Sequence, residues 1–283
     1  TSRFTKKENI GNQTVFIGLY GLAGMGKTTL AKYLIHHPVK KYDLIINDFE
    51  PVSAWSAKFK NVKCFELTNQ YSMSLKDIPK PKNYNWLVLW AIKFIIPSKL
   101  GYGYHYKKYT ERIFFPIIRN KIRDLKVSTS DEIIVYLPTY SPKNLIEVIN
   151  QLPPNKKWTI FSLGTNKKEK ISGVSIEPLS EDLFLKKFAS CYGIVCAGGF
   201  ATTSEAIFLG KPMLVVPVEG QIEQQFNAAA LKNEGVTVID RFSKKNINEI
   251  KSWIDSPNVL EIKYEDESKK IIETIINDYS NLN

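Results

Sequence analysis

Residues 193–228 read GIVCAGGFATTSEAIFLGKPMLVVPVEGQIEQQFNA, and the apolar spacing changes twice within this segment. Ile194–Cys196 and Met213–Val216 have the composition of short buried strands. The residues between them follow Gly199, have the apolar spacing of a helix and stop at Gly210. The segment therefore predicts strand, glycine turn, helix and strand, which is one βαβ unit of a parallel sheet.

The glycine pair Gly198 and Gly199 lies where the first strand becomes the helix. Glycine lets the backbone approach a ligand closely, and the first turn of a helix offers unpaired N–H groups to a phosphate. Glu205 lies one turn further on, where its carboxylate could accept hydrogen bonds from ribose hydroxyls. A glycine pair alone is equally typical of a tight turn that binds nothing.

The longer pattern in this segment is more specific. It runs Gly-Gly-x-x-Thr-x-x-Glu, Gly-x-Pro, an apolar strand that ends in proline, and Glu-Gln-x-x-Asn-Ala. In order and spacing it resembles the donor site of GT-B nucleotide-sugar glycosyltransferases, within the lipid-linked N-acetylglucosaminyltransferase and UDP-glycosyltransferase group. That resemblance implies that the glycine turn and threonine face the diphosphate, the first glutamate holds the ribose, and the Glu-Gln pair holds the donor sugar. The matching residues are Gly198, Gly199, Thr202, Glu205, Glu223 and Gln224.

Two positions depart from this family pattern. Ala197 stands where many members have His, which removes one candidate phosphate contact, and Glu223 stands where many have Asp, which bears on sugar preference. The resemblance further implies a metal-independent reaction with no cofactor, in which a nucleotide sugar, expected to be a UDP-sugar, is the donor substrate. A transferase-like module that binds a nucleotide sugar without turnover is an alternative.

The alternation of strands and helices extends beyond this segment. Apolar runs at residues 132–137, 157–162, 174–178 and 235–240 predict further strands of a parallel, doubly wound sheet. The loop after the first run carries Thr139 and Ser141, which the resemblance makes weaker candidates for donor contacts.

We therefore expect an α/β protein with two Rossmann-like domains. Val127–Asp131 is polar and has the composition of a linker. It would separate an abbreviated acceptor-side domain, residues 1–126, from a donor-binding domain, residues 127–283. The last helix, predicted at residues 268–282, would cross back to the first domain, as is common in two-domain GT-B proteins.

A second phosphate-binding pattern lies near the N-terminus. The β-rich run Thr14–Tyr20 leads into Gly21–Thr28, which fits G-x-x-x-x-G-K-[ST] with Lys27 for the outer phosphates and Thr28 for Mg²⁺. A P-loop protein that binds ATP or GTP is therefore the alternative function. However, Pro38–Tyr42 leaves no room for the extra strand and helix that such domains usually contain. In a GT-B domain the same loop would be the first βα turn, with Lys27 where His is often found.

Asp48 and Glu50 follow directly on the apolar run Leu44–Asn47. Carboxylates at the carboxyl end of a strand lie where α/β sheets bind ligands, so either could be the general base that activates an acceptor hydroxyl. A helix N-cap is an equally plausible role for a carboxylate at this position. The predicted reaction is hexosyl transfer to a lipid-linked or other hydroxyl acceptor, with a lipid or a glycan as the possible acceptor.

Residues 84–97, YNWLVLWAIKFIIP, are apolar nearly all round, with lysines before and after them. This run is too short to span a bilayer but suits a helix on an anionic membrane surface, although core packing is the more frequent explanation. The following residues 101–106, GYGYHY, predict an aromatic–glycine loop that could stack on a sugar, and His105 within it is more often structural than catalytic.

Charge and cysteine content limit the partners and the compartment. A net charge of +11 suits nucleotide diphosphates or acidic lipid headgroups. Nucleic acid is the weakest candidate because no zinc-finger, RNA-recognition or basic-zipper pattern occurs. Three widely spaced cysteines form neither a disulfide framework nor a zinc site, and the polar N-terminus is unlike a signal peptide. We expect a cytoplasmic protein, with peripheral attachment to the inner face of the membrane as an option.

Overall fold

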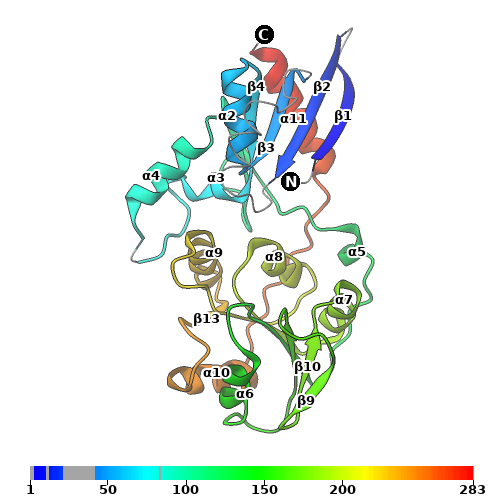
Figure 1. Cartoon of the computed structure of the whole chain (residues 1–283), viewed down its shortest axis with the longest axis vertical. Coiled ribbons are helices and arrows are strands. Elements are labelled where there is room, and N and C mark those ends of the chain that lie inside the picture. Colours follow the sequence, from blue (N-terminus) through cyan, green and yellow to red (C-terminus); the bar gives the residue numbers. More distant parts are fainter. Residues whose placement is uncertain (1–2, 11–12, 22–41, 83, 283) are drawn as a thin grey trace. The chain divides into compact units, whose positions relative to one another are not determined.

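The computed structural model describes residues 3–10, 13–21, 42–82 and 84–282. The chain divides into two compact units, which are described separately below (Figure 1). The first comprises Thr1–Ile78, Asn83–Pro116 and Asp266–Asn283, and the second comprises Pro79–Lys82 and Ile117–Glu265. The predicted boundary at residues 126 and 127 lies inside the second unit, and the extent of each domain stays a prediction.

Among the described residues, the first unit forms a six-stranded sheet in the order β1-β2-β3-β4-β5-β6. β1 (Arg3–Ile10) and β2 (Gln13–Gly21) are an antiparallel hairpin. The other strands continue in parallel from β2, namely β3 (Leu44–Asp48), β4 (Lys63–Leu67), β5 (Leu100–Tyr104) and β6 (Ile113–Phe114). The strand expected at residues 14–20 is β2, whereas the polar β1 has no apolar alternation that predicts a strand.

Helices cover both faces of this sheet. α2 (Pro51–Phe59) packs Ala54 and Ala57 against Ile45 of β3 on one face. On the other face, α11 (Ser268–Asn281) inserts Ile271 and Ile275 among Leu44, Ile46 and Phe65. The last helix therefore belongs to the first unit, as expected from the resemblance. Two more helices of this unit are α3 (Asn69–Met73) and α4 (Trp86–Ile95).

The predicted aromatic–glycine loop at residues 101–106 is wrong, because most of it is the buried strand β5. Tyr102 is fully buried, and its hydroxyl donates to the carboxylate of Asp278 at 2.6 Å. The glycines are needed because α3 packs directly on the strand: a Cβ at Gly101 would lie 2.1 Å from the Tyr71 ring. His105 is also buried, so these aromatic side chains form core rather than a platform for a sugar.

Among the described residues, the second unit forms a seven-stranded sheet in the order β13-β12-β11-β7-β8-β10-β9. All neighbours are parallel except β9, which forms a hairpin with β10. The strands are β7 (Glu132–Tyr136), β8 (Lys157–Ser162), β9 (Glu169–Ile171), β10 (Val174–Pro178), β11 (Gly193–Cys196), β12 (Met213–Val215) and β13 (Thr237–Val238). The predicted strands are all present, and the exposed hairpin strand β9 is an addition.

The helices of the second unit follow the strands in alternation, as a doubly wound fold requires. They are α5 (Asn120–Arg123), α6 (Pro142–Ile149), α7 (Glu181–Ser190), α8 (Phe200–Phe208), α9 (Ile222–Asn233), the short 3₁₀ helix η2 (Lys244–Asn246) and α10 (Ile247–Asp255). The core between sheet and helices contains Val195, Leu214, Leu145 and Trp253. This apolar layer holds the carboxyl ends of β7, β11 and β12 in register.

The polar segment Val127–Asp131, predicted as a linker, is anchored to the second unit. Lys211 is 2% exposed, and its ammonium group donates to the carbonyl oxygens of Ser128 at 2.5 Å and Cys191 at 2.9 Å. Burial lowers the pKa of Lys211, because the charged form loses hydration. The backbone of this segment is thus fixed by a buried cation.

Candidate functional site

The turn after β11 requires glycine at one position. Gly198 has a φ of +78°, and a Cβ there would lie 3.1 Å from Cγ1 of Val215 and 3.4 Å from the carbonyl oxygen of Gln224. L-residues with a side chain seldom adopt such a φ. The Gly198 carbonyl also accepts a hydrogen bond from the amide of Asn227 at 3.1 Å. The turn is therefore packed against β12 and α9 and held in one conformation.

The next residue, Gly199, faces open space. It is the N-cap of α8, its φ is −63°, and no side chain caps the helix. A Cβ added at Gly199 would meet no atom of the described residues within 4 Å, and the hydroxyl of Thr203 donates back to the Gly199 carbonyl at 3.0 Å. An uncapped helix N-terminus beside open space is an arrangement that can bind a phosphate. Thr202, in the same turn, is half-buried.

Glu205, the predicted ribose ligand, is buried and ion-paired. Arg119 donates from Nε to Oε1 at 2.7 Å and from Nη2 to Oε2 at 3.1 Å, and the side chain of Glu205 is only 7% exposed. Arg119 also reaches Glu181 of α7 at 2.9 Å. The hydrogen bond to Glu205 raises the pKa of Arg119 further above its ordinary value. Both oxygens of Glu205 therefore already have a strong donor, and a ribose would have to share them.

The other predicted donor residues lie on neighbouring elements of the same unit. Gln224 is on α9, and its side-chain oxygen accepts from the backbone N–H of Val218 at 3.0 Å, so it shapes the loop after β12. Glu223 precedes it in the first turn of α9 and is half-buried. Thr139 is exposed after β7, and Ser141 caps α6 through the N–H of Asn144 at 3.3 Å.

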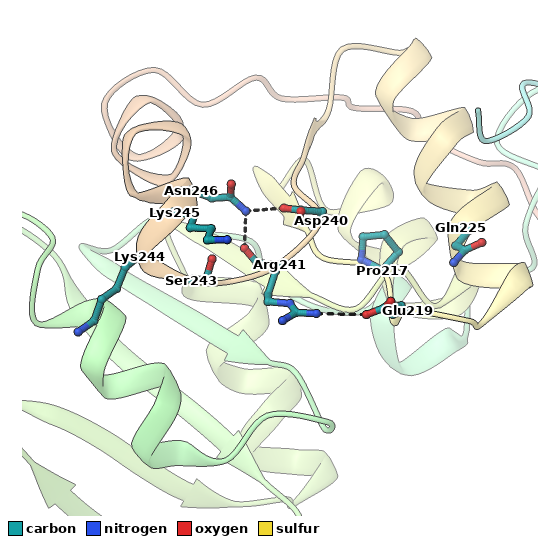
Figure 2. A pocket seen from close by; sticks show the side chains of 9 residues that line it. All are labelled: Pro217, Glu219, Gln225, Asp240, Arg241, Ser243, Lys244, Lys245 and Asn246. Carbon is teal, nitrogen blue, oxygen red and sulfur yellow. Dashed lines mark hydrogen bonds and ion pairs between the residues drawn. The ribbon is translucent and has the colours of Figure 1, made fainter. Parts of the chain in front are cut away.

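A cavity of about 790 Å³ lies beyond the ends of β12 and β13 (Figure 2). Arg241 and Glu219 form an ion pair of 3.1 Å at its side, and Asn246 donates to Asp240 at 2.6 Å. None of the predicted donor residues lines it, although Gln225 is their neighbour in sequence. We place the candidate phosphate site at the first turn of α8, because the N-terminus of a helix without a side-chain cap offers the chemistry that a phosphate needs. The cavity is an adjoining feature of the same sheet edge.

In the first unit, Asp48 ends β3 at the carboxyl edge of the sheet and is exposed. The surrounding protein nevertheless desolvates its carboxylate and raises its pKa, which a hydrogen bond from Thr68 partly opposes. Burial and the charge of Asp48 also raise the pKa of the Tyr104 hydroxyl, which stays protonated and able to donate. The structure thus brings a carboxylate and two hydroxyls together at the ends of β3, β4 and β5.

Glu50, the second candidate base, is a helix cap. Its carboxylate accepts from the N–H groups of Val52 at 3.1 Å and Ser53 at 2.7 Å, and the residue is 3% exposed. The preceding Phe49 has a φ of +47°, an uncommon conformation for a residue with a side chain. Of the two roles open to Glu50 from the sequence, the geometry favours the N-cap, and a catalytic role has no support in these contacts.

Glu66 is a buried carboxyl group on β4 that sequence reasoning missed. It is 9% exposed, and the Ser98 hydroxyl donates to it at 3.4 Å. Burial raises its pKa to about 7, the Ser98 hydrogen bond lowers it and the negative charge of Asp48 raises it again. A signal was present, since Glu66 interrupts the apolar strand KCFEL. Nothing in the sequence indicated the ion pair of Arg119, because its partner Glu205 is 86 residues away.

The alternative P-loop function falls on residues that the structure does not describe. Gly21 is the last residue of β2, and residues 22–41, which contain Lys27 and Thr28, lie outside the described ranges. That function stays a prediction.

The described ranges also bear on metal binding and on membrane spans. No group of three or more His, Cys, Asp or Glu side chains there could hold a metal ion. In the same ranges, no helix has the length and hydropathy needed to cross a bilayer.

Comparisons with known proteins agree with the fold. The spinosyn forosaminyltransferase SpnP superimposes with a TM-score of 0.51 at 12% identity, over 80% of this chain and 71% of that chain. The glycotransferase of kitacinnamycin gives a TM-score of 0.52 at 13% identity, over 80% of this chain and 70% of that one. At these identities the likeness shows the GT-B fold alone. No curated protein matches the chain.

The family itself is shown by a sequence model. The model described as glycosyl transferase family 1 matches residues 4–256, which span both sheets and the turn at Gly198 and Gly199. The chain therefore belongs to glycosyl transferase family 1 and is a glycosyltransferase that takes its sugar from a nucleotide-diphosphate donor.

Proposed function

We propose that this chain transfers a hexose from a UDP-sugar to a lipid-linked or other hydroxyl acceptor. The observation that carries the proposal is the first turn of α8, where Gly198 fixes the turn and Gly199 leaves the uncapped helix end open. When the bond between the sugar and the diphosphate breaks, negative charge develops on the leaving phosphate. Oriented backbone N–H groups at a helix N-terminus stabilise such charge without rearranging.

The proposed division of roles follows the two sheets. In the second unit, the α8 turn with Thr202 binds the diphosphate, Glu205 contacts the ribose, and Glu223 and Gln224 lie toward the donor sugar. Arg119 holds the carboxylate of Glu205 in one orientation, so ribose hydroxyls would use the lone pairs that the guanidinium leaves. In the first unit, Asp48 removes the proton from the acceptor hydroxyl, with Thr68 and Tyr104 as its polar neighbours.

Gly199→Ala tests the donor site with little risk to the fold. Its φ of −63° suits alanine, and within the part of the chain that the structure describes the new methyl group meets no atom within 4 Å. A diphosphate in that space would collide with the methyl group, so we expect UDP affinity to fall about tenfold or more, which is roughly 1.4 kcal/mol. Isothermal titration with UDP measures this, and dTDP in parallel tests the base preference.

Gly164→Ala is the matched control. It lies in the same unit, and its Cβ would have Ser162 Oγ as its nearest neighbour at 3.9 Å. UDP should bind this variant as it binds the wild type. Equal UDP affinity of Gly199→Ala and wild type, or no UDP binding by either, would reject the proposed donor site. Product formation from a panel of UDP-sugars then separates a transferase from a module that only binds.

A further inference from the structure

An exposed aromatic face lies on α4 and the end of α2 in the first unit. Trp86, Trp90 and Phe94 follow each other at helical i, i+4 spacing and are 65%, 57% and 57% exposed. Phe59 of α2 is 70% exposed. Large apolar side chains gathered on one face of a protein mark an interaction surface rather than a chance exposure. We call these four residues the aromatic face.

The aromatic face is held in place by contacts between the two helices. The indole N–H of Trp55 in α2 donates to the carbonyl oxygen of Ile95 in α4 at 3.1 Å. Its ring lies 5.7 Å from that of Phe59, while the rings of Trp90 and Phe94 lie 4.2 Å apart. The exposed rings are therefore prearranged, which reduces the entropy lost on binding a partner.

A cavity of about 600 Å³ borders the aromatic face at Phe94. Lys58, Lys63 and Lys99 are among the described residues that line it, and none of those described residues is acidic. Lys58 lies over the Trp55 ring at 4.8 Å, so a cation is already held beside the apolar surface. We call this cavity the lysine pocket. Lys58 and Lys99 bring positive charge to this hollow, as a phosphate group requires, while the Lys63 ammonium group already donates to the carbonyl oxygen of Leu282 at 3.2 Å.

The lysine pocket is distinct from the proposed reaction site. Lys63 is the first residue of β4, and Lys99 directly precedes β5, so the pocket lies at the amino ends of parallel strands. Asp48 lies at the carboxyl end of β3, which is the opposite edge of the same sheet. The pocket therefore serves binding rather than the acid–base chemistry proposed for Asp48.

We propose that the first unit docks on an anionic lipid surface, with the aromatic face in the headgroup–acyl boundary and a lipid phosphate in the lysine pocket. Trp and Phe beside lysines are the composition of helices that lie in such an interface. A second copy of this chain is a poorer occupant, because a symmetric contact would bring lysine against lysine. The net charge of +11 also attracts the protein to an anionic lipid surface. This inference stands apart from the transferase proposal.

The experiment measures co-sedimentation with vesicles of phosphatidylcholine, with and without phosphatidylglycerol. Wild type should bind only the anionic vesicles. Lys58→Glu with Lys99→Glu should weaken binding by about tenfold or more, since each lysine near an anionic surface contributes about fivefold. Trp86→Ser, Trp90→Ser and Phe94→Ser together should weaken it at least as much, by removing the apolar contact. Quenching of tryptophan emission by brominated lipid should accompany wild-type binding and be lost in this triple variant.

Lys167→Glu with Lys170→Glu is the matched control, because both lysines are exposed on the second unit and the charge change is identical. It should bind anionic vesicles within about twofold of wild type. An equal loss in both double-lysine variants would mean a response to net charge and would overturn the proposal. So would equal binding to neutral vesicles, or no binding to either.

Two further arms separate the other occupants. Inorganic phosphate should release the protein from vesicles no better than chloride at the same ionic strength, and specific release would assign the pocket to free phosphate instead. UDP titration and circular dichroism should be unchanged in every variant, which shows that each one folds. Self-association of wild type that the triple aromatic variant abolishes, without vesicle binding, would assign the face to a second copy.

Discussion

Removal of Arg119 should destabilise the second unit, because it leaves the buried carboxylate of Glu205 without its ion-pair partner. In Arg119→Ala, Glu205 loses donors at 2.7 and 3.1 Å, and its side chain is only 7% exposed in the intact protein. Breaking a buried ion pair from one side costs about 3–5 kcal/mol. Since Arg119 itself is half exposed, water enters more easily, and we expect a loss of about 2–3 kcal/mol in the free energy of unfolding.

The pair can be isolated by a double-mutant cycle with Glu205→Ala. When both partners are removed, no unpaired charge remains, so the double variant should cost about 1–2 kcal/mol less than the sum of the single ones. Arg241→Ala is the matched control, because its pair with Glu219 has a similar length of 3.1 Å but side-chain exposures of 65% and 88%. That substitution should cost about 0.5 kcal/mol or less.

Urea unfolding, followed by tryptophan emission and by hydrogen exchange of the α8 backbone, measures these differences. Trp158 and Trp253 are buried in the second unit and report on its core. Two results would refute the reasoning. One is an Arg119→Ala cost no larger than that of Arg241→Ala, and the other is strict additivity in the cycle. Either would mean that Glu205 is solvated well enough to need no partner.

Three further predictions concern the other titratable and backbone features. The Glu66 carboxyl group has a pKa of about 7 in the folded chain, compared with an ordinary value of 4.5. Between these two pH values the folded chain keeps a proton that the unfolded chain releases. The free energy of unfolding therefore falls as the pH rises from 4.5 to about 7. Glu66→Gln should therefore gain up to about 3 kcal/mol over wild type above about pH 7 and nothing below 4.5, and urea midpoints that show the opposite slope would contradict this. Gly198→Ala should lower the free energy of unfolding by about 2 kcal/mol, because the φ of +78° is unfavourable for alanine and Val215 lies 3.1 Å from the new methyl group. Thermal or urea unfolding measures this, and an unchanged midpoint would argue against the turn as described. Asp48→Asn should lower kcat about 100-fold or more without weakening UDP binding, and an unaltered rate would remove Asp48 as the base.

Much of the secondary structure of the second unit could be predicted from local sequence. Residues 193–228 predicted β11, α8 and β12 with the glycine pair at their turn, because periodicity and turn chemistry depend on neighbours a few residues apart. The same signals predicted the α/β class and its parallel sheet, since alternating strands and helices leave few other ways to bury their apolar faces. For Glu50, however, cap and base were equally compatible with the local residues.

What only the tertiary structure decided depends on groups far apart in the chain. Gly101 looked like part of a loop until α3 was seen to place the Tyr71 ring against it, which makes the glycine a packing requirement of a strand. Glu205 looked like an open ribose ligand, but its environment depends on Arg119, 86 residues away. Burial and charge pairing set the pKa and the accessibility of a side chain, and both depend on which distant segments pack around it. Local sequence therefore determined most of the secondary structure of the second unit and the family pattern of the α8 turn. The tertiary structure decided which carboxylates form an ion pair, cap a helix or stay exposed, because these roles depend on distant segments.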